Sequence, residues 1–399
     1  GGASLFVPYS MGVKSNRDDW VYGGSKKKTL RRVAVMVDFY NDQCRDFTNS
    51  NSEAPEDFVS RDKSKIKWTS NLIADVGKNL EHEFHESYLT KALYRPFSKQ
   101  WLYSSKTWNW SRHLMPRFFP DSDTKNLAIS FTGRGSTKGF STLITNTLPD
   151  LEVVSKGQWL PLRSFITRPA AEGLLNSESN EGLDGITNSG LLHFSKKYPK
   201  AKISKEDLFF YVYSIFHSED YRTRFSDNLS KELPRIPAVK AAKDFWHFSK
   251  AGRDLAELHL NYETVAMYPA AKVQGCDMKS KDKATFRVEK MKYGKERVDG
   301  KLVADKTTLH YNNQITVTGI PLAAYDYVVN GKPALDWVVE RQCVKTDKKS
   351  GIVNDANDWA IETMNNAKYP LELFERVITV SLETMKIVNG LPALELPIE

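Results

Sequence analysis

The stretches YRPFSKQWLY (residues 94–103) and FTGRGSTKGFSTLITNTLPDLEVV (residues 131–154) lie in the part of the chain where short strands are joined by loops of basic and small residues. Arginine, lysine, glycine and hydroxyl side chains alternate there with aromatic rings, a mixture suited to phosphate oxygens and base edges. The same composition also suits ordinary turns between strands. Short apolar runs broken by glycine and proline, between about residues 92 and 165, predict a small sheet.

Helical patterns flank this region on both sides. Apolar spacing that includes Leu30, Val33 and Val37 predicts an amphipathic helix before it. After it, Ser204 and Asp207 form a capping-box pattern ahead of a strongly apolar helix. The other predicted elements are helices at 66–86, 238–260, 321–342 and 370–389, strands at 151–154, 284–293 and 308–318, and a linker at 169–190.

Length and composition bound the fold class. The chain has 399 residues, more than one domain usually holds, so we expect two lobes. Hydrophobic residues make up 40% and aromatic residues 12%, as in a folded soluble protein. No apolar run reaches the roughly 18 to 20 residues that cross a bilayer, and the first residues lack a secretory pattern, so we expect no membrane partner and a cytoplasmic location. The expected fold is α+β, with small mixed or antiparallel sheets packed against several amphipathic helices.

Basic residues are concentrated in two segments. The net charge is +8, and residues 1–140 carry 22 basic and 15 acidic side chains. Residues 271–350 carry 16 basic and 10 acidic side chains, whereas residues 351–399 carry 3 and 8. Two separate basic segments suit a polyanionic partner that is contacted from two places.

Motifs for catalysis are missing from the sequence. The chain contains no Asn-Pro dipeptide, so it lacks the Asn/Asp-Pro-Pro-aromatic loop with which adenine methyltransferases hold a flipped base. GRGSTKG at residues 133–139 has the wrong spacing for the phosphate loop of a motor protein. Cys44, Cys276 and Cys343 are too far apart for zinc or disulfide spacing and indicate free thiols. We therefore expect no catalytic residue, no metal and no cofactor in this chain.

The two opening stretches resemble, in wording and order, the C-terminal target-recognition region of single-chain Type ISP restriction-modification enzymes and of large helicase-related bacterial proteins. The resemblance covers nearly the whole chain. It continues through KEDLFFYVYSIFHSEDYRTRFSDNLSKELPRIP (residues 205–237), VTGIPLAAYDYVVNGKPALDWVVERQCVKTDKKSGIVNDANDWAIE (317–362) and PLELFERVITVSLETMKIVNGLP (370–392).

In that family one polypeptide joins a nuclease, a DNA-translocating motor, a methyltransferase and a C-terminal recognition region, and this chain resembles the last. The resemblance implies double-stranded DNA as partner, together with the methyltransferase and motor lobes of a parent chain. It implies S-adenosylmethionine, ATP and magnesium as cofactors of the parent. It also implies that residues 1–50 begin with the segment that leaves the methyltransferase core. From the residue patterns we expect a connecting helix in the rest of 1–50, an α/β lobe with basic aromatic and glycine-rich loops at 51–168, and a helical lobe with a β-hairpin near 280–320 at 169–399.

The candidate DNA contacts lie in four short segments. Arginine that is bidentate to guanine is the commonest specific contact, so Arg134 in its glycine-rich loop is the expected base contact. Arg95 either contacts DNA or stacks on its own aromatic neighbours, and the segment from Arg341 onward is either a DNA contact or a solvated helix end. The full set is Lys14, Arg17, Tyr94, Arg95, Arg134, Ser136, Lys138, Arg341, Lys345 and Lys348.

Two other functions remain open from the sequence. One is a lobe that couples the parent's motor to its methyltransferase without contacting bases. The other is a magnesium-dependent nuclease built from scattered acids, for which the candidates are Asp121, Asp123, Asp150 and Glu152.

Overall fold

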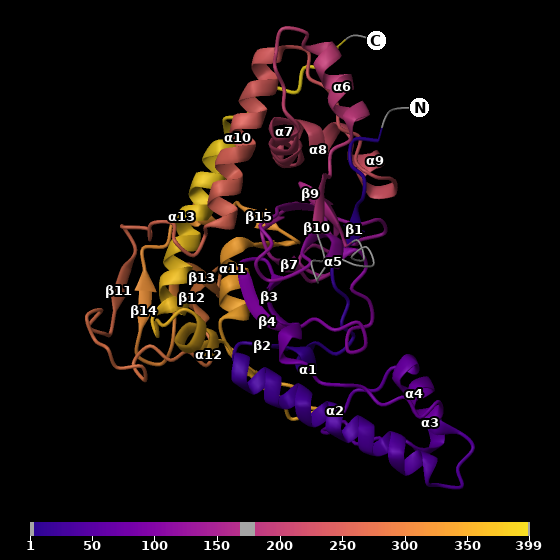
Figure 1. Cartoon of the computed structure of the whole chain (residues 1–399). Coiled ribbons are helices and arrows are strands. Elements are labelled where there is room, and N and C mark those ends of the chain that lie inside the picture. Colours follow the sequence, from indigo (N-terminus) through magenta and orange to yellow (C-terminus); the bar gives the residue numbers. More distant parts are fainter. Residues whose placement is uncertain (1–3, 168–179, 398–399) are drawn as a thin grey trace.

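A computed structural model describes residues 4–167 and 180–397. Small sheets occupy the middle of the molecule, a long helix near the N-terminus extends along one end, and a group of helices forms the other end (Figure 1). Most strand pairs are antiparallel, and the pair of β3 (Leu89–Arg95) with β7 (Leu148–Pro149) is parallel. This mixture confirms the predicted α+β fold of small sheets and amphipathic helices.

Two four-stranded sheets form the region that contains the two basic stretches. The predicted strand at 151–154 is wrong, because these residues turn back after β7 and the Gly157 N–H donates to the carbonyls of Leu151 and Val154 at 3.2 and 2.7 Å. One sheet has the order β2 (Tyr22–Gly23), β4 (Ser98–Tyr103), β3 (Leu89–Arg95), β7 (Leu148–Pro149), and the other has the order β1 (Ser10–Met11), β8 (Gln158–Pro161), β5 (Ala128–Phe131), β6 (Ile144–Thr145).

The amphipathic helix before the sheets is α2 (Lys26–Thr48), as predicted. Its N-cap side chain, Ser25, accepts from the Lys28 N–H at 3.1 Å. The predicted helix at 66–86 is wrong at both ends, because α4 covers Ser70–Gly77 and stops there. Asn79 takes a left-handed conformation with φ of 53°. The Leu80 N–H then donates to the Asp75 carbonyl at 3.0 Å, the hydrogen bond of a Schellman motif that ends the helix. Three short helices complete this part, α1 (Asp18–Val21), α3 (Pro55–Phe58) and α5 (Met115–Phe118).

The helical end of the molecule is built around α7 (Lys205–His217). Its capping box between Ser204 and Asp207 is confirmed, and all its residues from Leu208 to His217 are buried. The predicted helix at 238–260 is α10, and its Gly252 lies so close to the Phe210 carbonyl that a Cβ would clash. Of the predicted linker at 169–190, residues 169–179 fall outside the described residues, whereas the remainder contains a strand and the start of a helix. The elements here are β9 (Arg163–Thr167), β10 (Asn180–Asp184), α6 (Asn188–Lys197), α8 (Glu219–Arg224), α9 (Ser226–Lys231) and α10 (Ala242–Leu260).

A third four-stranded sheet contains the predicted β-hairpin near 280–320. Its strands β12 (Lys292–Val298) and β13 (Lys301–His310) are joined by a turn at Asp299 and Gly300, both with positive φ. The predicted strand at 284–293 is wrong for most of its length, because β12 begins at Lys292. The order is β11 (Lys272–Gln274), β14 (Thr316–Thr318), β13 (Lys301–His310), β12 (Lys292–Val298).

The predicted helix at 321–342 is interrupted by a tight turn. Asn330 and Gly331 have φ of 49° and 82°, the pattern of a two-residue hairpin turn. The helix α13 (Tyr369–Asn389) begins one residue before the predicted start and ends as predicted, and it runs beside α11 (Ala334–Arg341) and α10. The elements are β15 (Val328–Val329), β16 (Lys332–Pro333), α11 (Ala334–Arg341), β17 (Val344–Thr346), β18 (Val353–Asp355), α12 (Ala356–Asp358) and α13 (Tyr369–Asn389).

Two hydrophobic cores hold these elements together. The larger core combines side chains from the first 160 residues with those of 262–380. The second surrounds α7 and α10 and includes Phe6, Phe131 and Leu394. Each core therefore contains side chains from both sides of residue 169. The domain boundaries expected after residues 50 and 168 stay a prediction. Across residues 4–167 and 180–397, no helix is long and apolar enough to cross a membrane.

Candidate nucleic-acid interface

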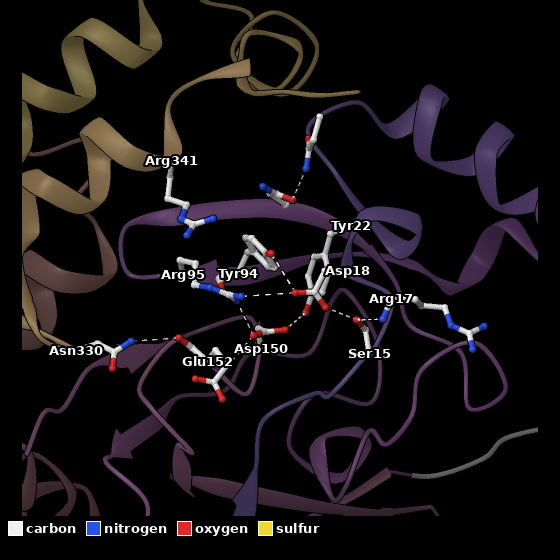
Figure 2. Close-up of polar contacts among 12 residues, drawn as sticks. Ser15, Arg17, Asp18, Tyr22, Tyr94, Arg95, Asp150, Glu152, Asn330 and Arg341 are labelled. Carbon is white, nitrogen blue, oxygen red and sulfur yellow. Dashed lines mark hydrogen bonds and ion pairs between the residues drawn. The ribbon is translucent and has the colours of Figure 1, made fainter. Parts of the chain in front are cut away.

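A buried polar network joins the opening segment of the chain to β3 and to the turn after β7 (Figure 2). The Asp150 carboxylate accepts from Arg95 Nη1 at 2.7 Å and from the Tyr22 hydroxyl at 2.9 Å. The Tyr94 hydroxyl donates to Asp18 at 3.0 Å. We call these five residues, Asp18, Tyr22, Tyr94, Arg95 and Asp150, the Tyr94 network.

Carboxylates outnumber cations in the Tyr94 network. Arg95 pairs with Asp150 and lies 3.5 Å from Asp18, while its guanidinium stacks 4.0 Å from the centre of the Tyr94 ring. Burial raises the pKa of Asp150 to about 6, and the Arg95 charge limits that rise. Burial lowers the pKa of Arg95, but the charges of Asp150, Tyr94 and Asp18 outweigh it and the pKa is raised. The Arg95 charge is thus neutralised inside the protein.

Two predicted contacts, Lys14 and Arg17, lie near the same network. Lys14 pairs through its backbone with Ser111, and its side chain is exposed. Arg17 is buried, 5.7 Å from the Trp108 ring, and donates to Thr69 at 3.1 Å. Burial lowers the pKa of Arg17 to about 10. The structure thus gives Arg17 a place in the interior and Lys14 one on the surface.

A second group of basic side chains surrounds one tryptophan. The centre of the Trp337 ring lies 5.8 Å from Lys138 Nζ, 4.4 Å from Lys332 Nζ and 5.9 Å from Arg341 Cζ. The orientation of the indole is fixed by its N–H, which donates to the Val329 carbonyl at 2.8 Å. We call Lys138, Lys332, Trp337, Glu340 and Arg341 the Trp337 cluster.

The Trp337 cluster contains one carboxylate for several cations. Glu340 pairs with Lys332 and accepts from Arg341 Nη2 at 2.5 Å. Partial burial raises the pKa of Glu340, but the hydrogen bond from Lys332 and the charges of Arg341, Lys332 and Lys345 outweigh it and lower the pKa. Lys138 adds a further positive charge on the same ring. The cluster is therefore net positive.

The glycine-rich loop at 133–139 is held in place next to this cluster. Lys156 Nζ donates to the Gly135 carbonyl at 2.8 Å, and the Asn330 side chain accepts from the Ser155 N–H at 2.9 Å. The Arg134 side chain is exposed, and Ser136 Oγ accepts a backbone N–H within the loop at 3.0 Å. The loop is anchored at its base and presents Arg134 to solvent.

The predicted segment from Arg341 to Lys348 runs from this cluster into a hairpin. Lys345 lies on β17 and is exposed. Lys348 lies in the turn to β18, which Asp347 closes by accepting from the Ser350 N–H at 2.7 Å. Arg341 also lies 5.9 Å from the Tyr94 ring, so the two groups are neighbours.

The structure thus brings Lys138, Arg341 and Tyr94 together although they are far apart in sequence. It adds three residues that the sequence analysis missed, namely Lys156, Lys332 and Trp337. Lys332 follows the Asn-Gly dipeptide at residues 330–331, a strong hairpin signal that was available in the sequence. Nothing in the spacing marks Trp337 as a neighbour of Lys138, or Lys156 as a partner of the glycine-rich loop.

The acids considered for a nuclease are spread over separate local contacts. The Asp121 carboxylate accepts from the backbone N–H groups of Asp123 and Thr124 at 3.0 and 2.7 Å and so stabilises a local turn. Asp150 belongs to the Tyr94 network. Among the described residues, no three His, Cys, Asp or Glu side chains are placed to hold a metal ion.

A family model described as the Type ISP C-terminal specificity domain matches residues 4–373. The chain belongs to this family. The resemblance inferred from the sequence is thereby confirmed. A comparison with curated proteins found no match.

Solved structures of Type ISP enzymes and of DrdV are similar to the specificity domain. A nuclease-deletion mutant of LlaGI in complex with a DNA substrate mimic is 32% identical with a TM-score of 0.84, over 100% of this chain and 34% of that one. LlaBIII bound to DNA is 33% identical with a TM-score of 0.84, over 100% and 24%. The DrdV–DNA complex is 30% identical with a TM-score of 0.79, over 98% and 36%. The specificity domain thus spans about a quarter to a third of the length of these relatives.

Proposed function

We propose that the specificity domain binds double-stranded DNA and selects the target sequence for the methyltransferase and motor lobes of a parent enzyme. The observation that carries the proposal is the Trp337 cluster, in which cations from the β5–β6 loop, the β15–β16 hairpin and α11 meet at one place. Such a group of basic side chains suits the phosphates that fix a protein's register on DNA. The solved relatives described above are DNA complexes, which supports the same partner.

Within this proposal the exposed Arg134 contacts a base. Its loop is anchored beside the cluster, so phosphates held by Lys138 and Lys332 would set the distance from Arg134 to a groove. The domain contributes recognition and no catalytic step, and needs no cofactor of its own. S-adenosylmethionine, ATP and magnesium belong to the upstream lobes, and the enzyme acts in the cytoplasm, where bacterial DNA lies.

The test is fluorescence anisotropy of a random-sequence duplex with the 399-residue chain, at salt concentrations from 50 to 200 mM. Affinity should fall steeply with salt, since each neutralised phosphate adds about 0.9 to the slope of log K against log salt. Selection of sites from the bound pool should then yield an enriched motif. Binding without any enriched motif would favour a coupling lobe, and magnesium-dependent cutting would favour a nuclease.

A matched pair of triple variants separates the cluster from net charge. Lys138→Gln, Lys332→Gln and Arg341→Gln together should reduce the salt slope by about two to three. Arg235→Gln, Lys250→Gln and Lys386→Gln remove the same charge from strongly exposed positions elsewhere, with side-chain exposures of 72, 76 and 78%. Equal loss in both triples would contradict an interface at the cluster.

A further inference from the structure

Glu340 lies where a phosphate would bind if the Trp337 cluster contacts DNA. Its carboxylate bridges Lys332 from the β15–β16 hairpin and Arg341 at the end of α11. Glu340 side-chain exposure is 33%, and that of Arg341 is 17%, so this pair lies at the protein surface without being fully solvated. The carboxylate therefore occupies the donors that an incoming anion would need.

The other acid on the same helix is already engaged. Asp336, one turn earlier on α11, accepts from the Tyr293 hydroxyl at 2.7 Å and pairs with Lys306 at 2.9 Å. These partners belong to the β12–β13 hairpin. Asp336 is thus a structural contact between α11 and the neighbouring sheet, whereas Glu340 faces the cations of the cluster.

A carboxylate and a phosphodiester use the same recognition chemistry. Both present two anionic oxygens, and Arg and Lys bind both through charge-assisted hydrogen bonds. Backbone phosphates also repel a carboxylate, so a phosphate that approaches Lys332 and Arg341 competes with Glu340 for them. Weakening the ion pairs of Glu340 therefore lowers the free energy gained from each phosphate contact at Lys332 or Arg341.

We propose that Glu340 is a built-in competitor of the DNA backbone: it pairs with Lys332 and Arg341 in the free domain and thereby lowers affinity for DNA of any sequence. The inference rests on the proposed DNA-binding function. Sequence-independent binding comes essentially from phosphate contacts, so an internal anion at one of these contacts limits it directly. The consequence is a domain that is held less tightly on random DNA than its basic charge would allow.

The experiment compares Glu340→Gln with Glu206→Gln in the 399-residue chain. Glu206 on α7 pairs with Arg253 of α10 at 3.1 Å and has 58% side-chain exposure, so its variant makes the same change in net charge outside the cluster. The probe is a random-sequence duplex, titrated between 50 and 200 mM salt. One additional phosphate contact changes affinity by about 3.5-fold over this range. E340Q should therefore bind at least about threefold tighter than E206Q at 50 mM salt, with a slope steeper by about one to two.

Two further variants keep the test independent of folding and of net charge. Glu340→Asp retains the charge but shortens the side chain by one methylene, so it should show part of the same gain. Adding Lys332→Ala to E340Q should abolish most of the gain. Thermal melting of each variant checks that the fold is intact.

The outcomes separate this inference from the function on which it rests. If the wild-type chain binds DNA but E340Q and E206Q bind equally, the competitor role is wrong and the DNA-binding function stands. A loss of sequence preference in E340Q without tighter random binding would also overturn the inference, since Glu340 would then contact a base. If neither the wild type nor any variant binds at 50 mM salt, both proposals fail.

Discussion

The Tyr94 network and the Trp337 cluster are built from the same kinds of side chain but differ in the balance of charge. In the first, the single guanidinium of Arg95 faces the carboxylates of Asp150 and Asp18. In the second, the single carboxylate of Glu340 faces Lys332 and Arg341, with Lys138 on the same ring. The position of an arginine beside an aromatic ring therefore does not indicate its role. The number of carboxylates that face each cation distinguishes an internal contact from a surface that suits an anion.

The largest expected effect is the loss of stability in Arg95→Ala. Removing one partner of a buried ion pair typically costs about 3–5 kcal/mol, because the other charge is left without compensation. Asp150 has 5% side-chain exposure and, within the described part of the chain, keeps the Tyr22 hydroxyl and a backbone N–H as its remaining donors. The free energy of unfolding from urea titration checks this. Arg134→Ala is the matched control and should change stability by no more than about 0.5 kcal/mol.

A loss below about 1 kcal/mol in Arg95→Ala would contradict the contrast between the two regions. Arg95 would then resemble a surface side chain, and its contribution to DNA binding would have to be measured instead.

The pH dependence of stability should have opposite signs in the two regions. The native pKa of Asp150, about 6, is above its unfolded value near 3.9, so the native state binds more protons between about pH 4 and 6. The stability contributed by Asp150 therefore falls as pH rises through this window, by up to about 3 kcal/mol. Relative to Asp150→Asn, the wild type should lose stability between pH 4 and 7. The native pKa of Glu340 is lowered, so relative to Glu340→Gln the wild type should lose stability as pH falls through the native pKa of Glu340.

Urea titrations of the three proteins from pH 7 down to pH 3 measure both trends, because the window for Glu340 lies below its ordinary pKa. The same sign for Asp150 and Glu340 would show that the charge balance inferred for one of the two regions is incorrect.

A third prediction concerns sequence preference. Arg134→Ala should weaken binding to the selected site by about 1–3 kcal/mol and relax the preference at one position. Arg134→Lys keeps the charge but loses the bidentate geometry, so it should retain affinity for random DNA while losing the preference. Anisotropy with the selected duplex and with single-base variants measures both. Uniform weakening across all sequences would make Arg134 a phosphate contact.

Periodic and capping patterns in the sequence predicted the long helices because these signals are local. α7 begins at its capping box, and α13 runs from Tyr369 to Asn389 much as its apolar spacing indicates. The helix predicted at 66–86 failed because Asn79 stops it in a left-handed conformation. The helix predicted at 321–342 failed because the hairpin turn at Asn330 and Gly331 was overlooked.

The site was predictable only in part, because its charge balance depends on contacts between distant segments. Arg95 meets a carboxylate 55 residues away, and Tyr94 donates to one 76 residues away. Composition around Arg95 is basic and aromatic, and its neutralising partners lie outside any local window. The same holds for Lys138, whose neighbours at the Trp337 ring come from a different part of the chain.

The smallest expected effect sharpens the boundary between the two regions. Tyr94→Phe removes the hydroxyl that donates to Asp18 at 3.0 Å but keeps the ring against Arg95 and within 5.9 Å of Arg341. One lost hydrogen bond should cost about 0.5–1.5 kcal/mol of unfolding free energy. If the network serves only to position the loops, DNA affinity and salt slope should stay at wild-type values, because no cation has been removed. A changed salt slope in Tyr94→Phe would mean that Asp18, once released, alters the charge presented by Arg341, and that the two regions act as one electrostatic unit.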